Sequence, residues 1–296
     1  MLQKALLFFY FSLLTLHAQS LEPRLYTNVP TDLNFVVLGA SHSEGALPSN
    51  SALIDPKLNI NTTVFAYARS LNIAGHSAKL DLVIPAGCID GTATLSGNKV
   101  SRDVCGLADI KTRLAFNIFG APATSLKNFS SYEQDTILGM SLQVTLPTGQ
   151  YDKSKLVNIS ANRWALKLGT GVSKKINSFL FEVALDAEYY TQNNDFLGQT
   201  RQQDIIYSSQ IHLIYLLQKG VWFGVDANYY IGGENTQNDV KLGDALDNSR
   251  YGATFSFPLS RTNSIKITAS SGIFARAGSN FDTIGVFWQY HFVDNF

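Results

Sequence analysis

The segment FDTIGVFWQYHFVDNF, residues 281–296, decides the fold class of this chain. One of its two alternating sets is apolar and aromatic: Ile284, Val286, Trp288, Tyr290, Phe292 and Phe296. The other set holds Gly285, Gln289 and His291, with Phe287 among them. A period of two is typical of a β-strand with one apolar and one more polar face. Such a strand at the C-terminus is what a transmembrane β-barrel needs to close against its first strand, whereas in a soluble sandwich it would expose an aromatic ridge. Because Asp294 breaks the alternation, we expect the strand to end at Phe292.

The first twenty residues predict an exported protein. Lys4 precedes an apolar run over residues 5–16, and the small residues Ala18 and Ser20 follow. This order is typical of a secretory signal with a small-x-small cleavage site, and the run is too short to span a bilayer comfortably. We therefore expect residues 1–20 to be a signal peptide and residues 21–296 to form a single barrel domain.

Charge and hydropathy narrow the class further. The chain has 23 basic and 23 acidic residues, so it lacks the basic excess that nucleic-acid binding usually requires. Hydrophobic residues make up 45% of it, yet no stretch after the signal approaches the roughly 18 apolar residues of a transmembrane helix. A membrane protein without such helices must close its strands into a barrel, because lipid offers no partners to bare backbone groups.

Twelve strands are predicted from alternation along the chain. The clearest four cover residues 179–190, 221–230, 250–257 and 265–273, where charged side chains alternate with Phe, Val and Leu. Weaker patterns cover residues 33–40, 62–72, 76–85, 107–120, 136–148, 163–174 and 205–218, and the C-terminal strand completes the set. In the strand that begins at Thr62, the phase is open, since Val64 and Phe65 compete for the lipid side.

The lengths of the connections support the barrel independently. Long connections at residues 41–57, 86–106, 149–162, 192–203 and 233–247 alternate with short ones at 73–75, 175–177, 219–220 and 261–264. Outer-membrane barrels have long outer loops and short periplasmic turns, whereas a soluble sandwich has no reason to alternate. The connections at 121–135 and 277–280 depart from the rule. The predicted fold is therefore an all-β, transmembrane antiparallel β-barrel of about 12 strands.

The two cysteines, Cys88 and Cys105, fall in one predicted outer loop. An oxidising compartment favours a disulfide between them, which would contribute about 3 kcal/mol under the chain-entropy model. A zinc site is not indicated, because the chain has no second cysteine pair and no His close to these two. We expect a staple within one surface loop.

Strand phase predicts which polar side chains face the lumen. They are Arg163, Lys167, Glu182, Asp186, Glu188, His212, Asp226, Arg250 and Lys266, and we expect Lys111 and Arg113 to join them. These charges either set a field that selects small solutes or pair with one another and fill a narrow lumen. A row such as Glu182, Asp186 and Glu188 beside Asp226 would be costly without water or cations opposite, so we expect some hydration.

No catalytic, metal or cofactor site is predicted. A lipid-hydrolysing barrel would need a Ser, a His and an acid or amide together at the lipid-facing rim. His212 is instead predicted on the inner face with Ser208 and Gln210, where a His usually fills space. The remaining histidines lack metal-ligand spacing. The aromatics Tyr151, Phe196 and Phe281 near strand ends could line a hydrophobic mouth, but their position favours an interfacial girdle.

Short motifs spread over nearly the whole chain resemble one known family. In order, they are Leu21-Glu22-Pro23-Arg24 with Asn34-Phe35, Tyr67-Ala68-Arg69-Ser70, Gly106-Leu107-Ala108-Asp109, PTGQYD at 147–152, LVN at 156–158, NRW at 162–164, YTQNNDF at 190–196, QD at 203–204, HLIY at 212–215, SRYG at 249–252, GSNFD at 278–282 and WQY at 288–290. The series resembles the outer-membrane proteins grouped as "putative MetA-pathway of phenol degradation", which are described as transporters.

The resemblance implies a bacterial outer-membrane barrel that passes small hydrophobic or aromatic molecules and has no catalytic residues or cofactor. The partners expected are outer-membrane lipid, the barrel-assembly machinery through the C-terminal strand, and a small-molecule substrate, with no nucleic acid. Two alternatives stay open: a structural or plugged barrel without transport, and a lipid-hydrolysing barrel enzyme. The cysteine-bearing loop is not a feature of the family, so its role is open.

Overall fold

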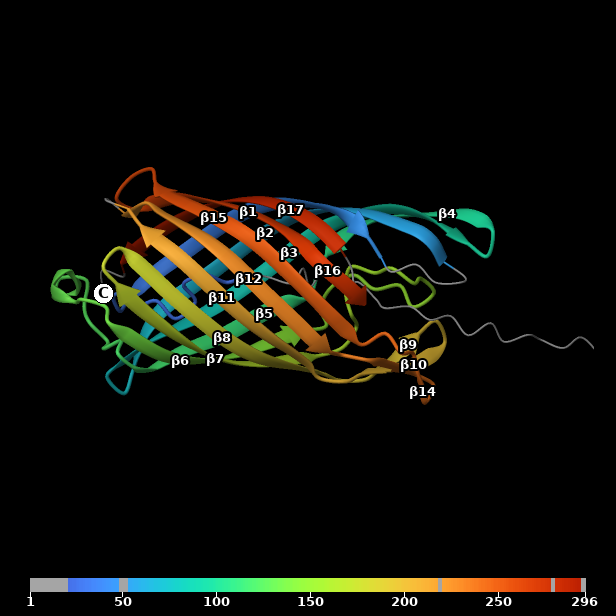
Figure 1. Cartoon of the computed structure of the whole chain (residues 1–296), viewed down its shortest axis with the longest axis horizontal. Helices are drawn as coiled ribbons and strands as arrows, with labels where there is room; N and C mark the ends of the chain where they lie inside the picture. Colours follow the sequence, from blue (N-terminus) through green and yellow to red (C-terminus); the bar gives the residue numbers. More distant parts are fainter. Residues whose placement is uncertain (1–20, 48–52, 218–219, 278–279, 294–296) are drawn as a thin grey trace, which may run out of the picture.

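The computed structural model describes residues 21–47, 53–217, 220–277 and 280–293, and this part of the chain is a β-barrel (Figure 1). The expected signal peptide and the last three residues lie outside the described residues. The barrel strands are β1 (Leu33–Ala46), β2 (Leu53–Ile73), β3 (His76–Leu95), β5 (Ile110–Phe119), β6 (Thr136–Leu146), β7 (Ala165–Ile176), β8 (Phe179–Tyr190), β11 (Ile206–Leu216), β12 (Trp222–Gly232), β15 (Leu246–Pro258), β16 (Asn263–Ala277) and β17 (Asn280–Val293).

The ring of strands is closed by its two ends. β17 pairs antiparallel with β1 from Leu33↔Val293 to Ala46↔Asn280, and β2 pairs with β3 to complete the circle. The prediction of a twelve-stranded antiparallel barrel that closes through its C-terminal strand is confirmed. The last strand reaches Val293, one residue beyond the expected end. No helix among the residues described here is both long and apolar enough to cross a bilayer.

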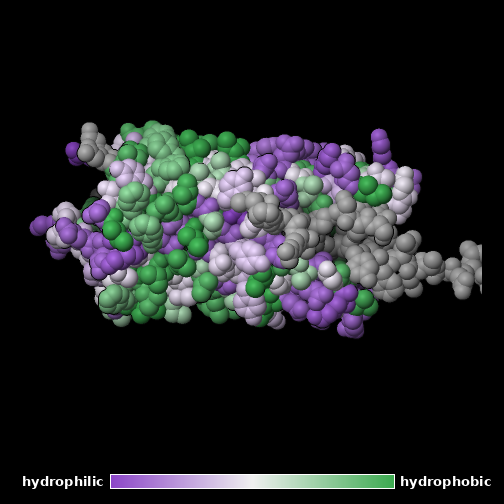
Figure 2. All heavy atoms as spheres, in the orientation of Figure 1, coloured by the Kyte–Doolittle hydropathy of each residue, from purple (hydrophilic) through white to green (hydrophobic). Residues whose placement is uncertain are grey.

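The alternation along the strands separates an apolar outer face from a polar inner one. On β8, Val183 is 50% exposed on the outside, whereas its neighbour Glu182 is 7% exposed inside. On β2, the open phase is resolved by Phe65, which is exposed on the outer face. Apolar residues gather along the barrel wall in the left half of Figure 2, and hydrophilic residues dominate its right end. The outer face is therefore suited to contact with acyl chains.

The two ends of the barrel differ. At the turn end, which carries the β2–β3 and β7–β8 turns, the turn residues Ala74, Gly75 and Asn177 have positive φ and reverse the chain tightly. One longer connection at this end runs over residues 120–135 and contains the short 3-10 helix η1 (Phe129–Ser131). The opposite end, called the loop end below, carries the longer connections, so the predicted alternation holds with its exception at 121–135.

Several connections predicted as loops contain strands instead. β1, β2 and β3 continue past the predicted ends, and β4 (Asn98–Leu107) returns along β3, so residues 86–107 form a hairpin rather than a loop. The connections after β8 and β12 form a second sheet of β9 (Asn193–Phe196), β10 (Gln199–Gln203), β13 (Asn235–Gln237) and β14 (Val240–Lys241), called the outer sheet below. In this hairpin and in the outer sheet, backbone donors and acceptors of the connections pair with one another. The polar composition of these segments did not reveal that pairing.

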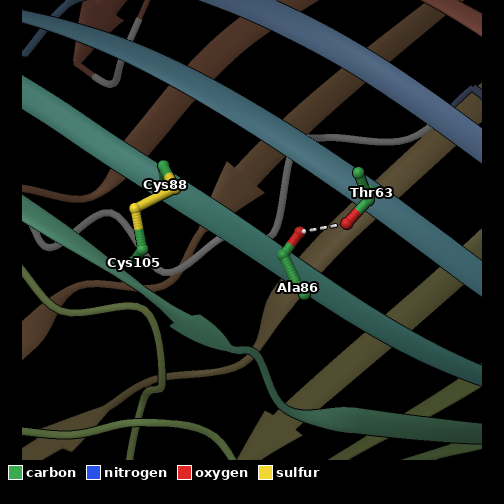
Figure 3. The surroundings of a disulfide bond; sticks show 4 residues. All are labelled: Thr63, Ala86, Cys88 and Cys105. Carbon is green, nitrogen blue, oxygen red and sulfur yellow. Dashed lines mark hydrogen bonds between the residues drawn. A yellow bond between two sulfur atoms is a disulfide. The ribbon is translucent and has the colours of Figure 1, made fainter.

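The disulfide lies in this hairpin and not within an irregular loop. Cys88 on β3 and Cys105 on β4 are directly opposite in the register, and their sulfur atoms are bonded (Figure 3). In the sheet order β4 pairs with β3 alone, so the bond ties an edge strand to the barrel. The expectation of a staple inside a loop was wrong about the surroundings of the cysteines, because β-pairing continues through both of them.

Candidate functional site

The N-terminal segment, residues 21–32, occupies part of the lumen. The backbone N–H of Glu22 donates to Oε1 of Gln210 at 3.2 Å, and the N–H of Arg24 donates to Oε2 of Glu182 at 2.6 Å. Further along, the amide of Asn28 donates to the carbonyl of Pro122 at the turn end, at 3.2 Å. The segment therefore runs from the β11 wall down to the turn end before β1 begins, and it narrows that half of the lumen.

One aromatic ring fixes the segment to the wall. Tyr26 is 5% exposed, and its hydroxyl lies 3.2 Å from the hydroxyl of Ser141 on β6. Its ring lies against Gly139, Gly169 and Gly171, and a Cβ added to any of them would come within 2.2–3.2 Å of a ring or hydroxyl atom of Tyr26. These three glycines, called the glycine cradle below, leave the space that the ring fills.

An ion-pair cluster holds the same segment to the neighbouring strands β5 and β3. Arg113 on β5 pairs with Glu22 of the segment, and its Nη2 lies 2.8 Å from Oδ2 of Asp81 on β3. Arg113 therefore lies on the inner face, as strand phase indicated. Its two carboxylate partners come from different parts of the chain, so the cluster joins the N-terminal segment to the barrel.

The inward acidic residues are buried and have partners. Glu182, Asp186 and Asp226 are each at most 8% exposed. Asp186 lies 3.7 Å from Nζ of Lys167 and accepts hydrogen bonds from Ser208 and Gln210, both at 3.3 Å. The row of acids expected to be costly is thus compensated by one cation, by neighbouring side-chain donors and by the backbone of Arg24. Glu188, in the same row, is half-buried on the inner face.

His212 on β11 is paired with Asp226 on β12. Its Nδ1 lies 2.5 Å from Oδ1 of Asp226, and the other oxygen of that carboxylate accepts from Thr254 at 3.3 Å. Ser208 donates to Asp186 rather than to His212. Within the described ranges, no three His, Cys, Asp or Glu residues are grouped so as to hold a metal ion. The arrangement is that of a hydrogen-bonded pair filling the wall.

Three lysines on the inner face differ from Arg113 and Lys167 in their charge partners. Lys266 on β16 is exposed inside the barrel, and its Nζ lies 5.2 Å from the ring centroid of Phe287. Lys79 on β3 and Lys111 on β5 are half-buried on the same inner surface. None of the three has a carboxylate within ion-pair distance in the part of the chain that the structure describes, in contrast to Arg113 and Lys167.

The loop end is narrowed by the connection between β6 and β7, residues 147–164, called the inner loop below. Asp109, 3% exposed, accepts hydrogen bonds from Gly149 N at 3.0 Å, Ser160 Oγ at 2.6 Å and Ala161 N at 2.9 Å. An apolar cluster of Leu47, Leu58, Ile60, Ile89, Ala108, Ile159 and Phe281 packs beside this loop. The mouth at this end is therefore partly apolar.

The expectation of an aromatic girdle at Tyr151, Phe196 and Phe281 was wrong. Phe281 is buried in the apolar cluster and Phe196 is 2% exposed under Arg201, while the hydroxyl of Tyr151 donates to the carbonyl of Asp195 at 2.8 Å. Phe281 is near the start of β17, Phe196 lies on β9 of the outer sheet and Tyr151 lies in the inner loop, so all three belong to the structure at the loop end.

Two buried arginines are found at the outer sheet, one of them on its strand β10. Arg163 is 4% exposed and stacks 4.3 Å from the ring centroid of Tyr190, with Nη2 donating to Gln203. Arg201 on β10 donates from Nε and Nη2 to Oδ1 of Asn235, at 3.0 and 2.7 Å, and burial lowers its pKa well below the usual range. Among the described residues, neither arginine has a carboxylate in ion-pair contact. Arg250, predicted for the lumen with Arg163, is also buried and donates to Ser270 at 2.8 Å.

Sequence reasoning missed three parts of this site. The N-terminal segment has no alternation with a period of two. The one sign of its position in the lumen was two charged residues, Glu22 and Arg24, among apolar residues shortly before β1. Asp109 gave no sign of its three hydrogen bonds, since its donors lie 40 to 52 residues away. Arg201 lay in a stretch read as a loop, where inward burial could not be anticipated.

Comparisons with known proteins agree with this architecture. Residues 41–288 match the family described as "Putative MetA-pathway of phenol degradation". The COG4313 outer membrane channel from Pseudomonas putida F1 superimposes with a TM-score of 0.79 at 19% identity, covering 92% of this chain and 100% of that one. The transport unit of the Escherichia coli autotransporter AIDA-I gives a TM-score of 0.56 at 10% identity, covering 90% and 92%. At these identities the likeness concerns the barrel fold. A search of curated proteins found no match.

Proposed function

This chain belongs to the family described as "Putative MetA-pathway of phenol degradation", and we propose that it is an outer-membrane channel for the passive uptake of small hydrophobic or aromatic compounds. The observation that carries the proposal is a closed barrel with an apolar outer face and a polar inner face, into which the chain's own N-terminal segment reaches. A narrow lumen of this kind admits small solutes and excludes polymers.

The route would begin at the loop end. Solutes would meet the apolar cluster beside the inner loop, where Ile159 and Phe281 offer a hydrophobic surface. They would then pass the Arg163 region and descend beside the N-terminal segment to the turn end. The outer loops, with the Cys88–Cys105 hairpin among them, would control access. Movement down a concentration gradient needs no cofactor or chemical step.

Cellular context completes the proposal. A signal peptide over residues 1–20 would direct export, the barrel-assembly machinery would recognise β17, and the bacterial outer membrane would solvate residues such as Val183. In this arrangement the loop end faces outward, and the turn end faces the periplasm, as in other barrels with long outer connections.

An uptake experiment tests the function. A porin-deficient bacterium expressing the full chain would be compared with an empty-vector strain for its uptake of 1-N-phenylnaphthylamine, which fluoresces in apolar surroundings and which an intact outer membrane excludes. Faster uptake with the protein, at equal membrane integrity judged by leakage of a periplasmic enzyme, supports the channel. Equal uptake in both strains, with the barrel present in the outer membrane, contradicts it.

One structural observation favours a second candidate, a plugged barrel that stiffens the envelope. Tyr26 and Glu22 anchor the N-terminal segment on the adjacent strands β5, β6 and β7, which would keep the lumen closed if the segment never moves. In that case, the intact protein would be silent in planar bilayers and in the uptake assay. Deletion of residues 22–28 would then open a conductance that the intact chain lacks.

A further inference from the structure

A groove of about 740 Å³ crosses β17, β1, β2, β3 and β4 on the outer face of the barrel. Its floor is one row of the strand register, called the floor row below, in which the small residues Ala40, Thr63 and Ala86 lie between Val286 and Leu107. These residues share the outward phase of Phe65. The next outward row toward the turn end holds larger side chains: Trp288, Leu38, Phe65 and Ile84. Small residues beside large ones therefore leave a hollow on a surface suited to lipid, with a volume typical of ligand sites.

The polar groups that line the groove are turned toward other groups of the protein. The hydroxyl of Thr63 lies 3.5 Å from the carbonyl oxygen of Ala86 (Figure 3). On the loop-end side, the disulfide supplies sulfur atoms in place of strong donors, and Nδ1 of His42 lies 2.8 Å from Oδ1 of Asn61. An apolar chain that entered the groove would therefore leave few polar groups without a partner.

A row of carboxylates borders the groove on its loop-end side. Beyond the disulfide, the next outward row on the same five strands, called the acidic row below, consists of Asp282, Glu44, Asn59, Asp90 and Asp103. Glu44 is directly opposite Asp282, Asp90 is directly opposite Asp103, and all four acids are exposed. Like charges at opposite positions of an antiparallel pair are destabilising. The acidic row therefore favours a positive charge beside it.

The described part of the chain does not place a cation at ion-pair distance from these four carboxylates. Two of them accept a hydrogen bond from a neutral side chain, one from Asn59 at 3.1 Å and one from Ser271. Lys57, the nearest basic residue along β2, pairs with Asp55 at 3.3 Å instead, and Lys99 lies near the tip of the β3–β4 hairpin. Nor do the described residues form a metal site of their own here. The balancing charge must therefore arrive with a ligand.

Charge and surroundings distinguish the possible occupants of the groove. A second copy docked through the same face around a two-fold axis would bring one acidic row against another. With the loop end outward, the groove borders the outer leaflet of a bacterial outer membrane, which consists of lipopolysaccharide. This lipid has several acyl chains and several phosphates, and a divalent cation on a phosphate takes one or two protein carboxylates as further ligands. The acidic row spans four strand spacings, about 19 Å, and so can face several phosphates, whereas a phospholipid offers one.

We propose that the groove binds a lipopolysaccharide molecule of the outer leaflet. One acyl chain lies along the floor row, and divalent cations join the phosphates to the acidic row. The Cys88–Cys105 bond holds β4 against β3, and with it Leu107 at one end of the floor row and Asp103 at one end of the acidic row. The inference uses the proposed orientation of the barrel and goes beyond the proposed function, because it concerns the outer face and is independent of conduction through the lumen.

Binding of rough-type lipopolysaccharide to the purified full chain in detergent, measured by microscale thermophoresis, tests the groove. Ala40→Phe puts a ring on the floor row and should weaken binding by about tenfold. The matched control is Ala227→Phe, at an exposed outward alanine of β12 away from the groove, which should bind like the parent protein. The heat-induced gel shift of each variant shows that its barrel is folded.

The same assay tests the acidic row through its dependence on magnesium. Replacing magnesium chloride by EDTA should weaken binding to the parent protein by about tenfold. Glu44→Gln/Asp90→Asn removes one acid from each opposed pair, so its affinity should be low in both solutions. The control Asp239→Asn, at an exposed acid between β13 and β14, should keep the magnesium dependence of the parent.

Phosphatidylglycerol, which has one phosphate, is the competing lipid and should bind more weakly. Equal affinity for the two lipids, equal binding by Ala40→Phe and Ala227→Phe, or a magnesium dependence that persists in Glu44→Gln/Asp90→Asn overturns the inference. A dimer of the parent protein in analytical ultracentrifugation that Ala40→Phe converts to a monomer also overturns it, because a second copy would then occupy the groove. None of these measurements involves conduction, so their failure would leave the channel standing, and a silent channel would leave lipid binding standing.

Discussion

Replacement of Tyr26 by Ala should release the N-terminal segment from the lumen wall. The ring is almost fully buried in the glycine cradle and its hydroxyl contacts Ser141. Removing a buried aromatic side chain typically costs about 3–5 kcal/mol, and the low end applies because the segment keeps its bonds to Glu182 and Gln210. About 3 kcal/mol corresponds to a roughly 100-fold larger ratio of undocked to docked segment.

Single-channel recording measures this shift directly. In a planar bilayer, Tyr26→Ala should spend much more time in a state of higher conductance than the unmodified chain, because the turn-end half of the lumen is wider when the segment leaves. The matched control is Tyr189→Ala on β8, which removes a lipid-facing tyrosine that is 53% exposed and does not face the lumen. Its open-state statistics should stay those of the parent protein.

A double variant separates the cradle from a general loss of stability. In Gly171→Ala the new Cβ would lie 2.5 Å from Cε2 of Tyr26, so the ring must move and the segment should loosen. With Ala at position 26 that clash is absent, and Gly171→Ala should then have little further effect. Additive effects of the two substitutions, or an unchanged conductance in Tyr26→Ala, would refute the reasoning.

Three further predictions concern the loop end. Asp109→Ala removes three hydrogen bonds to a buried carboxylate, each worth about 1.5–3 kcal/mol, so limited proteolysis should cut the inner loop much faster while the barrel persists. Cys88→Ser should free β4, which pairs with β3 alone, and expose it to protease, but the heat-induced gel shift of the barrel should stay at the same temperature. Lys241 lowers the pKa of Glu234 below 4.5, so the stabilisation of the outer sheet that this pair gives is present above that pH and lost as the pH falls through the lowered value. Lys241→Met should therefore raise the pKa of Glu234 toward 4.5 in a carboxyl-detected NMR titration, and an unchanged midpoint would contradict the pairing.

The wall of the barrel was predictable because its physics is local. Alternation with a period of two directly records which side chain faces lipid, so Val183 and Glu182 could be assigned to opposite faces from sequence alone. The closure of β17 on β1 followed from its terminal position and its aromatic face. Extension of β1 to β4 beyond the wall could not be predicted in the same way, since outside lipid both faces of a strand tolerate polar residues and the period fades.

The contents of the lumen depend on contacts that sequence spacing does not encode. Arg24 meets Glu182 across 158 residues and Arg113 meets Glu22 across 91, and neither pair lies within one hairpin. Strand phase predicts that Lys167 points inward. Which carboxylate it pairs with depends on where the eleven other strands place their side chains. Strand phase therefore predicts the members of the lumen and leaves their pairing undetermined.

The distribution of hydrogen bonds decides which part of this molecule can move. Every wall strand is bonded on both sides, because the ring from β1 to β17 is closed, so widening the wall would break a whole ladder of backbone bonds. The N-terminal segment instead depends on a few contacts, chiefly the ring of Tyr26, the pair of Glu22 with Arg113, and the amide of Arg24 on Glu182. A change in the cross-section of the lumen therefore costs least when the segment moves and the barrel stays fixed.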